Sequence, residues 1–105
     1  MEALTVLTVT AASEEDLARI ARTLLDERLV GCANIVPAIR SLYTWQGEVH
    51  DEPEALAILH TRAALAQAVI DRVSEIHPYD IPQVVAVPLT GVHAGYADWL
   101  VVATR

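Results

Sequence analysis

The stretch that decides the fold is Ala3-Leu4-Thr5-Val6-Leu7-Thr8-Val9-Thr10, whose β-branched and alternating residues predict a strand. Ser13-Glu14-Glu15-Asp16 follows and predicts the start of a helix. The serine hydroxyl can accept a free N–H of the first turn, and the acids lie at the positive end of the helix dipole. Apolar residues at helical spacing continue to Leu25, and Gly31 is expected to end the helix in a left-handed turn.

The rest of the chain predicts further strands and helices. Further elements are expected over residues 32–43 (strand), 49–61 (strand), 63–76 (helix), 83–89 (strand) and 93–104 (helix). Pro37 requires a bulge or an edge position, Trp45-Gln46-Gly47-Glu48 predicts a turn, and Pro78 ends the second helix. Residues 3–37 and 55–88 thus form two similar halves. They predict an α+β, ferredoxin-like split βαβ fold, β-α-β-β-α-β plus a C-terminal helix, with four antiparallel strands and two helices on one face.

Length and charge exclude several classes of protein. The 105 residues suit a single domain, residues 1–105, without room for a second core. The net charge is −7 and lysine is absent, which argues against nucleic acid as a partner. No apolar run approaches the length of a membrane span, so no membrane partner is expected. The N-terminus lacks the features of a signal peptide and Cys32 is the single cysteine, so we expect a cytoplasmic protein.

Two strands are apolar at every position, Ala55-Leu56-Ala57-Ile58-Leu59 and Val84-Val85-Ala86-Val87. A sheet with one face in water should alternate between apolar and polar residues, so both faces of this sheet need cover. The terminal helix can mask part of the outer face, but it is short and leaves the hairpin of residues 40–60 uncovered. That hairpin carries Tyr43 and Trp45, residue types that are enriched at interfaces. These features predict an oligomer.

Metal-ligating residues gather locally in the hairpin, although no pair has the compact spacing of a zinc motif. The local cluster is Glu48, His50, Asp51, Glu52 and Glu54. In a strand, Glu48, His50 and Glu52 project to one side, and such oxygen-rich clusters suit hard or borderline divalent cations. The alternative interpretation is a solvated loop.

Two other stretches are candidates for ligand binding. Cys32 opens a strand, where it can be a small buried residue or, with a nearby base, a nucleophile. In His77-Pro78-Tyr79-Asp80-Ile81-Pro82 the histidine lies at a helix C-terminus, where the dipole favours its cationic form. The two prolines hold Tyr79 and Asp80 in a fixed pose, either as a rigid connector or as a binding loop. The candidate residues of a ligand-binding cleft are Cys32, Trp45, Tyr79 and Asp80. No triad or phosphate-cradling loop is present, and no enzymatic reaction is predicted.

Four longer motifs are recognisable, in this order: residues 27–37 (Glu27 to Pro37, including Gly31-Cys32-Ala33-Asn34), residues 41–48 (Ser41 to Glu48), His77-Pro78-Tyr79, and Tyr96-Ala97-Asp98-Trp99-Leu100. With these motifs the chain resembles the CutA family of divalent-cation-tolerance proteins over nearly its whole length. The resemblance implies a ferredoxin-like subunit in a tight homotrimer, in which long hairpins join the sheets of neighbouring subunits. Tyr43, Trp45 and Trp99 are then the candidate interface residues. It also implies tolerance and binding of copper and other divalent metals, with no established catalysis.

The chain departs from the family pattern at three positions. His60 stands where the family usually has lysine, Gln83 where glutamate is common, and Val9 where copper-binding members can carry cysteine. Of that thiol, imidazole and carboxylate set only His77 remains. The candidate metal ligands are therefore His77, with His60 as a substitute if it lies close by, and Glu48 with His50. No cofactor is obligatory, and copper or zinc is the candidate ion.

Three functions are compatible with these observations. The leading one is a trimeric protein of metal homeostasis whose partners are its own copies and divalent ions. The second is a regulatory trimer that binds a small molecule in a cleft between subunits, an analogy that rests on fold alone. The third is a small phosphatase, for which Arg40 near Pro37 is the candidate anion-binding residue.

Overall fold

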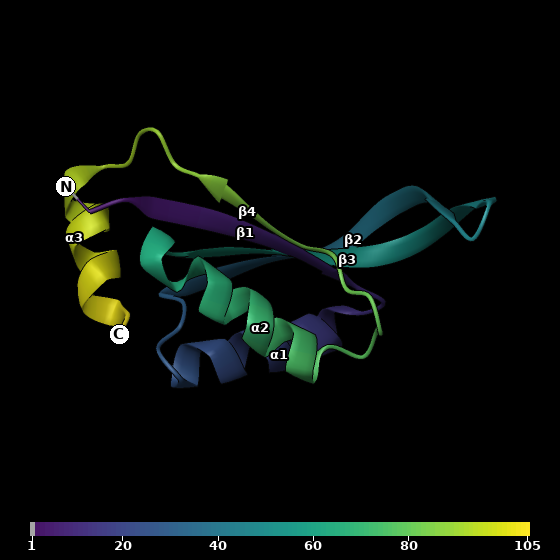
Figure 1. The fold of residues 1–105 in the computed structure, drawn as a ribbon, viewed down its shortest axis with the longest axis horizontal. Helices are drawn as coiled ribbons and strands as arrows, with labels where there is room; N and C mark the ends of the chain where they lie inside the picture. Colours follow the sequence, from purple (N-terminus) through teal and green to yellow (C-terminus); the bar gives the residue numbers. More distant parts are fainter. Residues whose placement is uncertain (1) are drawn as a thin grey trace.

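A computed structural model describes residues 2–105 as a four-stranded antiparallel sheet with three helices (Figure 1). The elements are β1 (Leu4–Ala11), α1 (Glu14–Asp26), β2 (Cys32–Trp45), β3 (Glu48–Arg62), a 3₁₀ turn (Ala63–Leu65) that leads into α2 (Ala66–Ile76), β4 (Val84–Pro88) and α3 (Ala94–Ala103). The strand order across the sheet is β2-β3-β1-β4. The predicted order of strands and helices is confirmed, and the observed ends differ from the predicted ones by a few residues.

Helices α1 and α2 cover one face of the sheet, and the main core lies between them and the strands (Figure 1). Alternate residues of β1 and β3 point into this core, among them Leu7, Val9 and Leu59, and they meet Leu17 and Val73 of the two helices. Each such side chain contributes about 1.5–3 kcal/mol by leaving water. No helix in the described part of the chain is long and apolar enough to cross a membrane.

The start of α1 matches the prediction, and its end does not. The Ser13 hydroxyl accepts the Asp16 N–H at 3.2 Å, as expected for a helix N-cap. The helix ends at Asp26, and Arg28, with φ of 58°, takes the left-handed conformation that was predicted for Gly31. Glycine is needed at position 31 for space instead, because a Cβ there would lie 2.4 Å from Leu100 Cδ1.

The β2–β3 hairpin is held by a tight turn and interrupted by a bulge. Gln46 and Gly47 both have positive φ, as a two-residue turn of the hairpin type requires. Farther from the turn the pairing register shifts by one residue: Ile39 pairs with Glu54, but Val36 pairs with Leu56. Residues 37 and 38 therefore face the single residue 55, which confirms the bulge predicted at the proline.

The face of the sheet opposite α1 and α2 is apolar and largely uncovered. Val85 and Val87 of β4 pair with Thr8 and Val6 of β1, and their side chains are 46% and 47% exposed. Helix α3 covers one end of this face, where Leu100 and other α3 residues pack on Leu4. The hairpin extends from the opposite end of the molecule, beyond the helices (Figure 1). The strands are thus apolar on both faces, as predicted, and α3 masks only part of the outer one.

Replacing Gly31 with alanine should destabilise the protein by about 1–3 kcal/mol, because the new methyl group would overlap the fully buried Leu100. The measurement is urea unfolding followed by circular dichroism. Gly91→Ala is the matched control, since a Cβ at that position meets no atom within 4 Å. Equal unfolding free energies for the two variants would contradict the packing explanation.

Candidate functional site

An open hollow of about 770 Å³ lies between the outer part of the β2–β3 hairpin and the loop that follows α2. We call it the hairpin hollow; its lining residues come from β1 (Thr10), the hairpin (Arg40, Ser41, Leu42, Tyr43, Trp45, Glu52 and Glu54) and the loop (Tyr79, Asp80, Ile81 and Gln83). The structure therefore brings together three of the residues predicted to form a cleft, namely Trp45, Tyr79 and Asp80. Cys32, the fourth, lies elsewhere.

Two tyrosines hold two carboxylates in the hairpin hollow. Tyr43 donates its hydroxyl hydrogen to Glu52 at 2.9 Å, and Tyr79 donates to Glu54 at 3.0 Å. Partial burial, and then the bond to Glu54, raises the pKa of Tyr79 to about 12. The bond to Glu52 likewise raises the pKa of Tyr43. Both phenols therefore stay protonated near pH 7 and act as hydrogen-bond donors to the two carboxylates.

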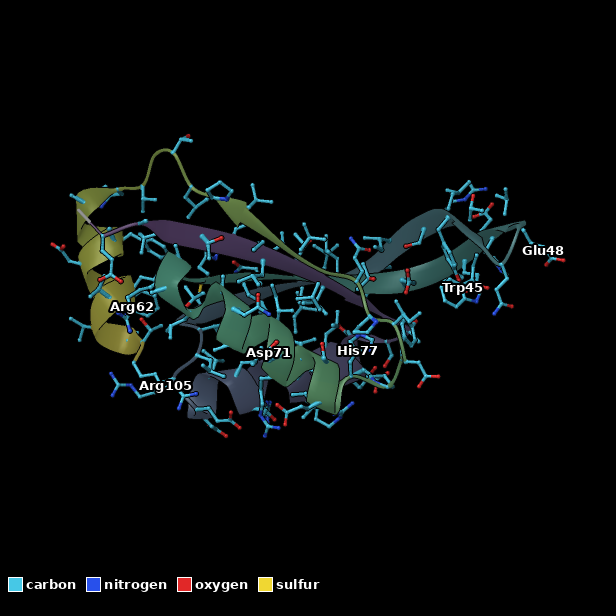
Figure 2. All side chains as sticks on the ribbon, in the orientation of Figure 1. Trp45, Glu48, Arg62, Asp71, His77 and Arg105 are labelled. Atoms are coloured by element: carbon cyan, nitrogen blue, oxygen red, sulfur yellow. The ribbon has the colours of Figure 1, made fainter. Side chains whose placement is uncertain are left out.

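Glu48, His50 and Glu52 share one side of β3, as expected for alternate residues of a strand. The pairing partners of β3 residues 48, 50 and 52 are Trp45, Tyr43 and Ser41, so these three side chains share one side of the strand. The ring of His50 stacks on Tyr43 with centroids 5.1 Å apart, and its Nδ1 lies 3.6 Å from Glu52. His50 thus belongs to the edge of the hairpin hollow, whereas Glu48 lies at the exposed hairpin tip (Figure 2).

Arg40, the candidate anion-binding residue, is paired within its own hairpin. Its Nε and Nη2 donate to the two carboxylate oxygens of Asp51 at 2.8 and 2.6 Å. These bonds lower the pKa of Asp51 and raise that of Arg40. The guanidinium therefore has a carboxylate partner already, and an incoming anion would have to displace it.

His77 is nearly buried, with 8% of its surface exposed, and both of its ring nitrogens are engaged. Nε2 lies 2.8 Å from the Thr10 carbonyl oxygen, which can only accept, so Nε2 carries the hydrogen. Nδ1 accepts the Tyr79 N–H at 3.0 Å. This arrangement fits the neutral imidazole and differs from the cationic form that the helix dipole alone would favour. His77 anchors the loop to β1, and a metal could bind only by displacing one of these bonds.

A second group of polar side chains lies near α3, and we call Cys32, His60 and Tyr96 the Cys32 cluster. Cys32 and His60 are pairing partners on β2 and β3, and Sγ lies 3.2 Å from His60 Nδ1. The Tyr96 hydroxyl lies 2.9 Å from the same sulfur, and its ring meets the His60 ring edge to face. Burial lowers the pKa of His60; burial and then the bond to Cys32 raise the pKa of Tyr96 to about 12.

Sequence reasoning singled out Cys32 and His60 separately and did not assign Tyr96 to any site. Counting outward from the Gln46-Gly47 turn pairs Cys32 with Thr61, and only the one-residue shift at the bulge brings it opposite His60. A prediction that combined the turn with the bulge at Pro37 could have found this pair. The position of Tyr96 depends on how α3 packs, for which the sequence carries no local signal.

The predicted metal ligands are distributed over three places. His60 belongs to the Cys32 cluster, His77 lies at the end of α2, and Glu48 and His50 lie in the hairpin, with Glu48 at its tip (Figure 2). Among residues 2–105, no three His, Cys, Asp or Glu side chains converge so as to hold one ion. A metal site within a single chain would therefore need fewer protein ligands or a rearrangement.

The three candidate interface residues are all partly open to solvent in the single chain. Tyr43, Trp45 and Trp99 expose 40%, 45% and 48% of their surface. Trp45 lies on the projecting hairpin, and Trp99 packs against Tyr96 on α3 with ring centroids 5.6 Å apart. These aromatic surfaces are available for contact with another copy.

Comparison with known proteins gives matches over almost the whole chain. The divalent-cation tolerance protein CutA of Thermus thermophilus is 41% identical over 95 residues, which are 90% of this chain and 92% of that protein. The chloroplastic protein CutA 1 of Oryza sativa is 40% identical over 100 residues, 95% of this chain. The chain spans little more than half the length of its plant relatives, 56% for rice and 55% for Arabidopsis thaliana.

Solved structures agree with the sequence matches. The crystal structure of CutA1 from Oryza sativa superposes with a TM-score of 0.95 at 38% identity and covers 99% of this chain and 95% of that one. The Thermus thermophilus protein gives 0.93 at 39% identity, with 97% and 99% covered. A model of the CutA1 divalent ion tolerance protein family matches residues 5–103. With nearly its whole length matched in sequence and in fold, the chain belongs to the CutA1 divalent ion tolerance family.

Proposed function

We propose that this protein is a cytoplasmic, ferredoxin-like homotrimer that confers tolerance to divalent cations by binding copper and related ions, without catalysing a reaction. The single observation that carries the binding part is the position of Glu52, Glu54 and Asp80 around one hollow in a chain of net charge −7. Oxygen ligands of this kind suit divalent cations. The proposal is also supported by the family and by the relatives, which are named for tolerance of divalent cations.

The trimer is supported by the uncovered apolar face of the sheet. Val85, Val87 and Val36 are exposed on that face, and α3 covers only the end where Leu4 lies. Exposed apolar patches of this kind mark interaction sites in soluble proteins. A second copy of the chain presents the same surface and the same projecting hairpin, so a closed ring of identical subunits can cover all of these faces at once.

Assembly also offers a way to complete the metal site. The carboxylates of Glu52 and Glu54 already accept phenol hydrogens within their own chain, and no third ligand converges on them in the described residues. They lie on β3 between the bulge and the turn, in the outer part of the hairpin. We propose that a neighbouring subunit contributes the remaining ligands, so that divalent ions bind to the trimer more tightly than to the single chain.

A second candidate function, a regulatory trimer that binds a small organic molecule, is favoured by the mixed lining of the same hollow. Trp45, Leu42 and Ile81 give it an apolar part beside the carboxylates, and its size suits a small ligand. Native mass spectrometry of the purified trimer distinguishes the two: an organic molecule retained in stoichiometric amount favours this candidate, and metal ions alone favour the first.

Val85→Glu should convert a trimer of about 34 kDa, three chains of 11.4 kDa, into monomers. The reason is that assembly would bury an unpaired carboxylate, which costs several kcal/mol. Light scattering coupled to size exclusion gives the mass. Leu25→Glu is the matched control, because it places the same charge on a partly exposed residue of α1, in the layer away from the outer face. A parent protein of about 11 kDa would refute the trimer.

The double variant Glu52→Gln/Glu54→Gln should bind Cu²⁺ and Zn²⁺ at least about tenfold more weakly, because the amides keep the shape of the side chains and remove two charged ligands. Isothermal titration calorimetry with the metal chlorides measures the affinity. Glu14→Gln/Glu15→Gln on the first turn of α1 removes the same charge elsewhere and should bind like the parent. Equal affinities for the two double variants, or no saturable heat with the parent, would count against the proposed site.

A further inference from the structure

The Cys32 cluster has the composition and the spacing of a site for a soft metal ion. A thiol sulfur and an imidazole nitrogen lie 3.2 Å apart, and a phenol oxygen lies 2.9 Å from the sulfur. Thiolate ligands select soft ions such as Cu(I), and imidazole binds copper as well. We propose that Cys32 Sγ and His60 Nδ1 bind one Cu(I) ion, a monovalent and thiophilic cation, at a site separate from the hairpin hollow.

The distance between the two donor atoms is close to what such an ion needs. With metal–sulfur and metal–nitrogen bonds of about 2.3 and 2.0 Å, and a solvent molecule as the third neighbour of the ion, a trigonal angle places the two protein donors roughly 3.7 Å apart. The observed 3.2 Å is that of a hydrogen bond, so the side chains have to separate by only a few tenths of an ångström. Small rotations about the side-chain bonds suffice, and the backbone can stay as it is.

The backbone holds the two ligands in place. Cys32 and His60 are direct partners in neighbouring strands, and the Gly31 N–H donates to the His60 carbonyl at 2.9 Å beside them. Tyr96 reaches the sulfur from α3, which packs on the same end of the sheet. A donor pair fixed by paired strands loses little freedom on binding, which favours affinity.

Charge and proton balance favour a monovalent ion. The thiolate and Cu(I) together are neutral, so the half-buried cluster gains no net charge when the ion binds. The thiol proton passes to solvent, no electron is transferred, and the Tyr96 hydroxyl can donate to the thiolate sulfur. No carboxylate is among the partners of these three side chains, so the cluster lacks the hard oxygen ligands that Mg²⁺ or Ca²⁺ would require.

The test is an anaerobic titration of the assembled protein with Cu(I) supplied as its bicinchoninate complex. The parent should remove one Cu(I) per chain from the chelator. Cys32→Ser and His60→Gln should each lower the affinity about tenfold or more, since removal of a direct ligand costs at least as much as removal of a supporting group. X-ray absorption of the loaded parent should show one sulfur neighbour of copper together with nitrogen or oxygen neighbours, and the sulfur should be absent in Cys32→Ser.

Matched variants separate this site from the hairpin hollow. His50→Gln makes the same exchange at a histidine outside the Cys32 cluster, and Glu52→Gln/Glu54→Gln alters the proposed divalent site; both should take up Cu(I) like the parent. Cys32→Ala is the second thiol variant, and circular dichroism confirms that each variant is folded. If the parent leaves Cu(I) on the chelator, or His60→Gln binds as the parent does, the proposal is overturned. A Glu52→Gln/Glu54→Gln protein that loses divalent-ion binding but still takes up Cu(I) would support two separate sites.

Discussion

The bulge in the β2–β3 hairpin is the constraint on which both candidate sites depend. Opposite residue 55, β2 carries two residues, Pro37 and Ala38, and the pairing shifts by one position between Val36 and Ile39. Because side chains alternate along a strand, a shift by one residue moves every later side chain to the other face. The turn at Gln46-Gly47 alone would set Cys32 opposite Thr61, which is buried. With the bulge, Cys32 instead faces His60 across the two strands.

The same shift makes one continuous surface out of two parts of the hairpin. On β3, the even-numbered residues from His50 to His60 share one side of the strand. Near the bulge this side carries Leu56 and Ile58, beyond it Glu52 and Glu54. β2 presents Val36 to the first part and Tyr43 to the second only because its own alternation is interrupted between them. The apolar outer face and the acidic hollow are therefore neighbours on one surface of the hairpin.

Local patterns predicted the elements of this fold well, since strands, caps and turns depend on neighbouring residues. Ser13 capped α1 as expected, and Pro37 marked the bulge. The failures involve contacts between distant parts of the chain. Gly31 was assigned to a left-handed turn, but its neighbour in space is Leu100, and this contact decides the residue type. His77 lies at a helix end as predicted, but its ring nitrogens contact the Thr10 carbonyl and the Tyr79 N–H, two partners that the local sequence does not indicate.

The candidate site shows the same division. Trp45, Tyr79 and Asp80, the residues proposed from sequence for a cleft, line one hollow; Trp45 adjoins a turn and the other two lie on a loop between prolines, both of which the sequence marks. Glu52 was placed with Glu48 and His50 on one side of a strand, and Glu54 was named only as a member of the same cluster. Their contacts with the tyrosines were not predicted, because these contacts cross from one element to another. Tyr96 was missed as a site residue for the same reason: α3 must pack on the sheet before its hydroxyl meets Cys32.

The absence of lysine has a consequence for the charge of the hollow. Acidic side chains in most proteins are balanced by nearby ammonium or guanidinium groups, but Arg40 is committed to Asp51. Glu52 and Glu54 are held by phenols, whose raised pKa values keep them neutral. A phenol donates a hydrogen bond to a carboxylate without bringing a positive charge, so these two bonds order the side chains and add no cation to the hollow. Clefts lined by one sign of charge attract ions of the opposite sign, and in this hollow the hydrogen bonds to the tyrosines hold the carboxylate oxygens of Glu52 and Glu54 in place.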